Sequence, residues 1–171
     1  MLWNAADFQT PPLTAAECKP KDLPTGLMST PTELLFPNAR DARAALAGVL
    51  LLYGHWELSH QVAQDVRTRE GSYWHAIAHR MEPDSWNSGY WFRQVGEHPI
   101  FTGLYKDAES VLAGADIGWQ LKKTWDPQLF IDWCDEARRV SDGGKTRAAC
   151  AIQRLECERL FSWCSVKTKD F

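Results

Sequence analysis

The chain has 171 residues, of which 44% are hydrophobic and 24% are charged, and this composition excludes a disordered or fibrous protein. A formal net charge of −3 leaves no broad basic surface to neutralise phosphates, which argues against nucleic acid as the main partner. The longest apolar run, residues 44–53, is too short to span a bilayer, and residues 1–10 lack a signal-peptide pattern. We therefore expect a cytoplasmic protein that does not associate with membranes.

Proline and helix-period patterns divide the chain into an arm and a series of helices. Most of the nine prolines lie in residues 1–40, so we expect this segment to be an extended arm packed on the domain. The predicted helices cover residues 41–66, 72–82, 85–95, 107–122, 127–140 and 145–166. The predicted fold is all-α: one domain, residues 1–171, formed by an irregular bundle of five or six helices with a proline-rich N-terminal arm.

The cysteine spacing predicts packing residues and no zinc-binding motif. The sequence has five cysteines and no CxxC pair. Cys150, Cys157 and Cys164 are seven residues apart, on one side of the last predicted helix, where we expect small apolar packing residues.

The first predicted helix carries an acid and a histidine on an otherwise apolar stripe. Steps of 100° per residue align Leu46, Leu50, Tyr53, Glu57, His60 and Gln64. Burying a carboxylate or an imidazole costs free energy unless each has a partner. Glu57 and His60 are therefore candidate catalytic residues with Gln64 in support, unless the stripe emerges into water beyond Tyr53.

Two histidines share one face of the second predicted helix. His75 and His79 are four residues apart and Glu82 follows one turn later, a spacing that can hold a metal ion. Glu57 and His60 have the ExxH spacing of dinuclear carboxylate proteins, but no second copy exists. We favour one divalent metal on His60, His75 and His79, and an exposed polar face is the alternative.

The segment after this helix combines aromatic, guanidinium and short polar side chains. The candidate substrate-binding residues are Arg80, Asp84, Asn87, Tyr90, Trp91 and Arg93. Flat rings beside guanidinium donors suit an oxygen-rich ligand such as a sugar or an anionic metabolite. An aromatic core with stacked arginines, and helix capping by Asp84, are the structural alternatives.

The last predicted helix has an acid within an apolar stripe. Glu156 aligns with Ile152, Leu160 and Trp163. We expect its partner to be an arginine or a histidine from the middle of the chain, which gives Glu156 a supporting role.

Several of these motifs resemble a group of short, uncharacterised bacterial and fungal helical proteins. The resemblance rests on Ser59-His60, residues 73–84, Asn87, residues 90–93 and residues 95–99. Residues 125–127 and 156–164 look similar too, so the resemblance spans roughly residues 45–165. It implies a shared site at these positions but no activity, cofactor or substrate. A second likeness is to metal-binding four-helix proteins with one histidine on one helix and HxxxH on another. There the HxxxH pair comes late in the chain, so we do not adopt that family.

Taken together, the residues indicate a small enzyme that acts on a polar or anionic organic molecule. The candidate catalytic residues, which would transfer protons with one divalent metal as an optional cofactor, are His60, His75, His79, Glu57 and Glu82. The reaction is open, since no serine elbow, phosphate loop or dinucleotide motif is present. The alternatives are a non-catalytic sugar- or metabolite-binding module, and an interaction protein with an aromatic interface, such as a homo-oligomer.

Overall fold

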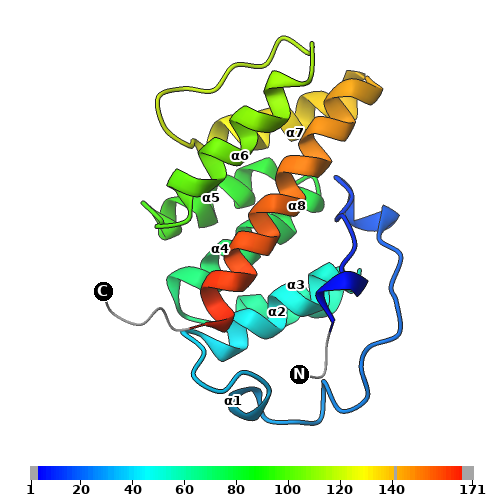
Figure 1. Ribbon diagram of the computed structural model, residues 1–171, viewed down its shortest axis with the longest axis vertical. Coiled ribbons are helices and arrows are strands. Elements are labelled where there is room, and N and C mark those ends of the chain that lie inside the picture. The colour runs from blue at the N-terminus through cyan, green and yellow to red at the C-terminus, as the bar shows by residue number, and fades with distance from the viewer. Residues whose placement is uncertain (1–3, 141, 167–171) are drawn as a thin grey trace.

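Helices provide all of the regular secondary structure that the computed structural model describes, which covers residues 4–140 and 142–166 (Figure 1). The α-helices are α1 (Thr32–Leu35), α2 (Ala42–Leu52), α3 (Trp56–Gln64), α4 (Arg69–Met81), α5 (Ser85–Val95), α6 (Phe101–Ala113), α7 (Pro127–Val140) and α8 (Gly143–Ser165). The all-α class is confirmed. In this part of the chain there are eight α-helices and no strand, against the five or six helices expected.

A single glycine accounts for one of the extra helices. The helix predicted over residues 41–66 is wrong because Gly54 adopts a φ of +83° between α2 and α3. A β-carbon at Gly54 would lie 2.6 Å from the Lys19 carbonyl oxygen, so the arm packs closely against this turn. Consequently α2 and α3 run in different directions, and the predicted stripe from Leu46 to Gln64 is broken.

The helix predicted over residues 107–122 is displaced. Instead α6 covers residues 101–113, and residues 114–126 form a connection that contains Gly118 at a φ of +74°. Local signals placed other boundaries correctly. Asp84 accepts a hydrogen bond from the backbone N–H of Asn87 at the start of α5, and Asp126 caps α7 in the same way.

The N-terminal arm follows the outside of the bundle but is only partly extended. It contains the 3-10 turns η1 (Ala5–Asp7) and η2 (Ala15–Glu17) as well as α1, and its residues 1–3 lie outside the described part. Figure 1 shows this blue segment passing along one edge of the molecule. Leu13, Leu27 and Phe36 are buried, which joins the arm to the core of the bundle.

Two helices, α4 and α8, each pack against three others. The helix α8 contacts α2, α6 and α7, while α4 contacts α2, α3 and α5. Within the described residues no helix combines the length and the apolarity needed to cross a bilayer.

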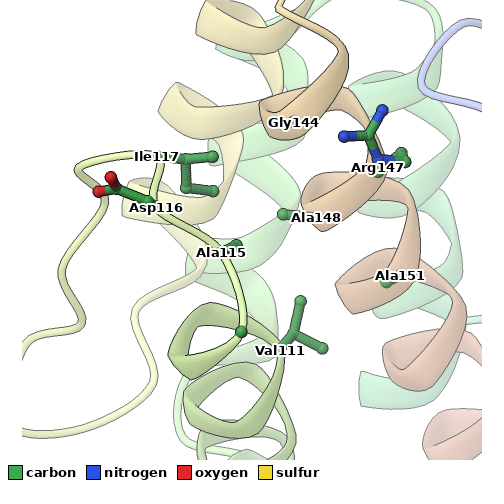
Figure 2. A pocket seen from close by; sticks show the side chains of 9 residues that line it. Val111, Ala115, Asp116, Ile117, Gly144, Arg147, Ala148 and Ala151 are labelled. Atoms are coloured by element: carbon green, nitrogen blue, oxygen red, sulfur yellow. The ribbon is translucent and has the colours of Figure 1, made fainter.

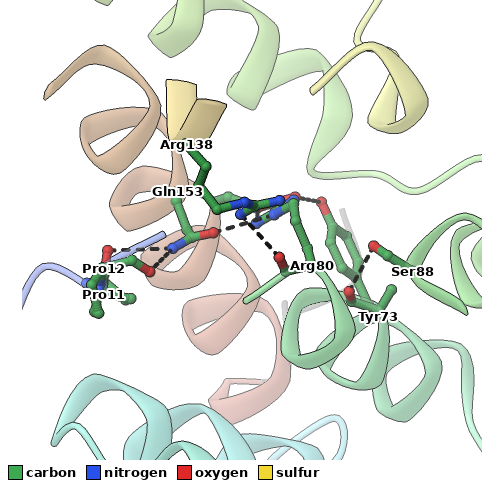
Figure 3. Close-up of polar contacts among 9 residues, drawn as sticks. Pro11, Pro12, Tyr73, Arg80, Ser88, Arg138 and Gln153 are labelled. Carbon is green, nitrogen blue, oxygen red and sulfur yellow. Dashed lines mark hydrogen bonds and ion pairs between the residues drawn. The ribbon is translucent and has the colours of Figure 1, made fainter. Parts of the chain in front are cut away.

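A buried polar network ties α4 to α8 (Figure 3). The Arg80 guanidinium donates to Glu156, and both side chains are fully buried. Tyr73 Oη donates to the other Glu156 oxygen at 2.9 Å, and Arg80 Nε donates to Gln153 Oε1 at 3.2 Å. The Gln153 amide also donates to the Pro12 carbonyl at 2.8 Å, so the network reaches the arm.

We expect Glu156→Gln to lower the free energy of unfolding by about 3–5 kcal/mol, because it leaves the buried Arg80 charge without its counterion. Urea-induced unfolding followed by circular dichroism measures this loss. The matched control is Glu158→Gln on the same helix, which removes a partly exposed pair with Arg154 and should cost about 0.5 kcal/mol or less. Equal losses in the two variants would contradict the interpretation.

Candidate metal centre

Three imidazoles from two helices converge on one point. His60 lies on α3, and His75 and His79 lie one turn apart on α4, which packs against α3. The Nε2 atom of His75 is 2.9 Å from Nε2 of His60 and 3.1 Å from Nε2 of His79. The ligand atoms of all three lie within 4.8 Å of one another. The expected juxtaposition of His60, His75 and His79 is therefore present, and we call these residues the histidine cluster.

Hydrogen bonds alone satisfy this arrangement poorly. The Nε2 atom of a neutral imidazole carries either one proton or one lone pair. Nε2 of His75 therefore cannot form a well-directed hydrogen bond to two neighbouring Nε2 atoms at once. A cation can satisfy all three lone pairs together once the imidazoles shift slightly, because nitrogens about 2.0–2.1 Å from one tetrahedral ion are about 3.3–3.4 Å apart.

The protonation of the cluster suits a metal ligand. Burial lowers the pKa of His75 to about 4, and the neighbouring His79 and His60 add to this decrease. Burial also lowers the pKa of His60, and His79 contributes, while Glu82 acts in the opposite direction. His75 is only 7% exposed. His60 and His75 are therefore neutral near pH 7, with lone pairs free to coordinate.

Aromatic side chains form the walls on two sides. The ring centroid of Trp91 on α5 lies 4.4 Å from that of His75, and the ring centroid of Trp56 lies 5.3 Å from that of His60. Trp56 Nε1 donates to the Ala78 carbonyl at 3.1 Å, which fixes α3 against α4 beside the cluster. The sequence interpretation missed Trp56, although its position one turn before His60 on a helix was a usable signal.

Glu82 stands behind the cluster and not among its converging nitrogens. Its Oε2 atom is 3.2 Å from Nδ1 of His79, within ion-pair distance but away from the direction of a hydrogen bond. A carboxylate beside Nδ1 favours the tautomer whose Nε2 lone pair faces a metal. Glu82 thus acts on His79 and is not one of the grouped ligands.

Four other candidate residues lie apart from the cluster. Glu57 and Gln64 are exposed, and Glu57 lines a separate cavity of about 280 Å³ with Cys18 and His55. Glu57 was misplaced because its predicted alignment assumed one continuous helix through Gly54. Arg80 and Glu156 pair in the core, so Arg80 does not face a ligand, and the arginine expected for Glu156 is Arg80.

The remaining candidates belong to α5 and its cap. Asp84 accepts hydrogen bonds from the backbone and the side-chain amide of Asn87, which supports the capping interpretation for both. Trp91 contacts the cluster. Tyr90 and Arg93 are exposed on the outer face of α5.

A larger cavity lies away from these residues (Figure 2). It has a volume of about 440 Å³ between the end of α6 and the start of α8, and its lining is mainly small and apolar, with Asp116 and Arg147 at its sides. None of the candidate residues lines it.

No protein-family model, curated protein or solved structure matches this chain.

The lowered pKa of His75 predicts a loss of stability in acid. The unfolded chain takes up a proton near pH 6.5, whereas folded His75 does so only near pH 4, so stability is present above pH 6.5 and falls between these values. The loss should be on the order of 2–3 kcal/mol. Urea unfolding of metal-free protein in chelator, from pH 7 to pH 4, measures it. A His75→Gln variant should show a flatter profile, and parallel profiles would refute the assignment.

Proposed function

We propose that the protein is an enzyme that uses one divalent metal ion, held by His60, His75 and His79, to act on a polar organic molecule. One observation carries the proposal: the Nε2 atom of His75 lies 2.9 Å from Nε2 of His60, on the neighbouring helix, and 3.1 Å from Nε2 of His79. Two of the imidazoles have pKa values lowered by burial. Neutral imidazoles whose Nε2 atoms converge in this way offer lone pairs that one cation would share.

The donor set favours a catalytic site over a structural one. Three protein ligands leave at least one coordination position for water or substrate, whereas structural zinc sites are closed by four protein ligands. Imidazole nitrogens suit zinc, copper, iron and nickel. We favour zinc, since the three neutral ligands keep the charge of the ion and so lower the pKa of a bound water to about 7.

In this proposal the chain's own residues divide the work. The histidine cluster holds the ion, and Glu82 holds His79 in the coordinating tautomer. Trp56 and Trp91 cover two sides of the cluster and reduce its contact with water. The reaction class that fits is addition of a metal-activated water to a carbonyl or related group, and the partner is a small molecule.

The proposed location is the cytoplasm. All five cysteines are free thiols, as is usual in a reducing compartment: Cys18, Cys134, Cys150, Cys157 and Cys164.

A second candidate function is a non-catalytic binding module, which the exposed aromatic side chains of α5 favour. It predicts ligand affinity without metal-dependent turnover.

Zinc titration calorimetry on protein purified without an affinity tag should give one site per chain. Because Glu82 acts through His79, Glu82→Gln should weaken zinc binding by about 10–100-fold. His75→Ala and His79→Ala each remove a ligand and should weaken it more than Glu82→Gln. Metal analysis of the untreated protein complements the titration.

Two matched controls keep this test specific. His55→Ala removes a histidine outside the cluster, and Glu57→Gln neutralises an exposed acid on α3. Both variants should bind zinc like the wild type. The metal site is refuted if zinc does not bind, or if the His55 and His79 variants lose the same affinity.

Zinc-loaded protein should hydrolyse 4-nitrophenyl acetate, and its rate should rise to a plateau above about pH 7 as the bound water ionises. Absorbance of the released nitrophenolate measures the rate against metal-free protein and against His79→Ala. Equal rates in all three would leave metal binding intact but contradict a catalytic role.

A further inference from the structure

The outer face of α5 carries two large aromatic side chains in open contact with solvent. Trp86 is 73% exposed and Tyr90 is 40% exposed. Their rings are almost parallel, at 13°, with centroids 6.2 Å apart. Exposing this much ordered apolar surface is unfavourable in water, and such patches commonly mark ligand or partner sites.

These rings are connected to the histidine cluster through aromatic contacts. The Tyr90 ring meets the edge of Trp91 at 5.3 Å, and Trp91 lies over His75 at 4.4 Å. Only these two ring contacts separate Tyr90 from an imidazole of the cluster. The exposed rings therefore adjoin the side chain that covers the histidine cluster on this side.

A cationic group lies at the opposite edge of the same face. Arg93 is exposed and falls on the stripe of Trp86 and Tyr90 at helical spacing. Its Nη1 atom is 3.4 Å from the position that a β-carbon on Gly89 would occupy, and Gln128 Oε1 of α7 is 2.7 Å from the same position, so the guanidinium lies back along α5 on the side next to α7. Arg93 makes no ion pair or hydrogen bond with any residue that the structure describes.

The nearby carboxylates have partners of their own, and on α7 Asp132 accepts a hydrogen bond from Gln128 Nε2 at 3.1 Å. Glu82 lies beside His79, and Asp84 accepts hydrogen bonds from Asn87 at the cap of α5. Arg93 therefore remains available to an external anion. A metal held by three neutral imidazoles would add positive charge at the other end of the face.

We propose that Trp86, Tyr90 and Arg93 form a platform that selects ring-bearing carboxylates and presents them to the histidine cluster. The flat face of the ring stacks on the exposed aromatic pair, the carboxylate pairs with Arg93, and the remaining end is directed toward Trp91 and the cluster. The shared chemistry is a ring joined to a carboxylate, which aromatic acids and sugar acids both offer. The inference rests on the proposed function for what happens at the metal, but the platform itself can be tested without it.

The test is calorimetric titration with two pairs of probes, on zinc-loaded and on metal-free protein. One pair is 3-phenylpropanoate and its neutral amide, and the other is glucuronate and glucose. For at least one pair the carboxylate should bind about fivefold more tightly than the neutral partner, and Arg93→Ala should remove this preference. Trp86→Ala should weaken both members of that pair by about fivefold. The responding pair tells whether the ring is aromatic or a sugar.

The controls are Gln94→Ala, an exposed neighbour of Arg93 on α5, and Leu34→Ala, a 71% exposed apolar residue on α1. Neither should change binding. Carboxylate binding that is lost in the Trp86 and Arg93 variants supports the platform even if zinc does not bind, so the two proposals can fail separately. The platform is overturned if both variants bind the probes like the wild type, if no probe binds saturably, or if Trp86 instead drives concentration-dependent self-association.

Discussion

The buried ion pair between Arg80 and Glu156 is the constraint on which the rest of this structure depends. Two full charges without exposure to solvent are tolerable only while they remain paired and hydrogen-bonded. Tyr73 and Gln153 supply those additional hydrogen bonds. The pair therefore fixes the rotation of α4 against α8 and leaves little freedom to either helix.

The histidine cluster depends on that rotation. His79 precedes Arg80 directly, so α4 presents its guanidinium to the core and its imidazoles to α3 within one helical turn. A small rotation of α4 would cost the ion pair its geometry and would separate His75 from His60. One face of α4 thus packs in the core and another carries two residues of the candidate metal centre. The buried ion pair therefore maintains the position of the ligands.

Exposure to solvent increases outward from the histidine cluster along α5. His75 is almost fully buried beneath Trp91, while Tyr90 and Trp86 continue the aromatic surface outward along α5. Burial keeps His60 and His75 unprotonated, as metal coordination requires. The exposed rings and Arg93 offer apolar area and charge at the surface. One short helix therefore connects a site where chemistry is proposed to a surface where recognition is proposed.

The sequence by itself determined the relations within single helices. The shared face of His75 and His79, the cap formed by Asp84 and the start of α7 after Asp126 follow from local geometry, since residues three or four apart on a helix have fixed neighbours. The convergence of His60 with that pair was expected, but only the tertiary structure determined its distances and removed Glu57 from the group. It also placed Arg80 in the core. The physical reason is that directions between helices depend on turns and packing: one positive φ at Gly54 redirects α3, and no helical period in the sequence contains that information.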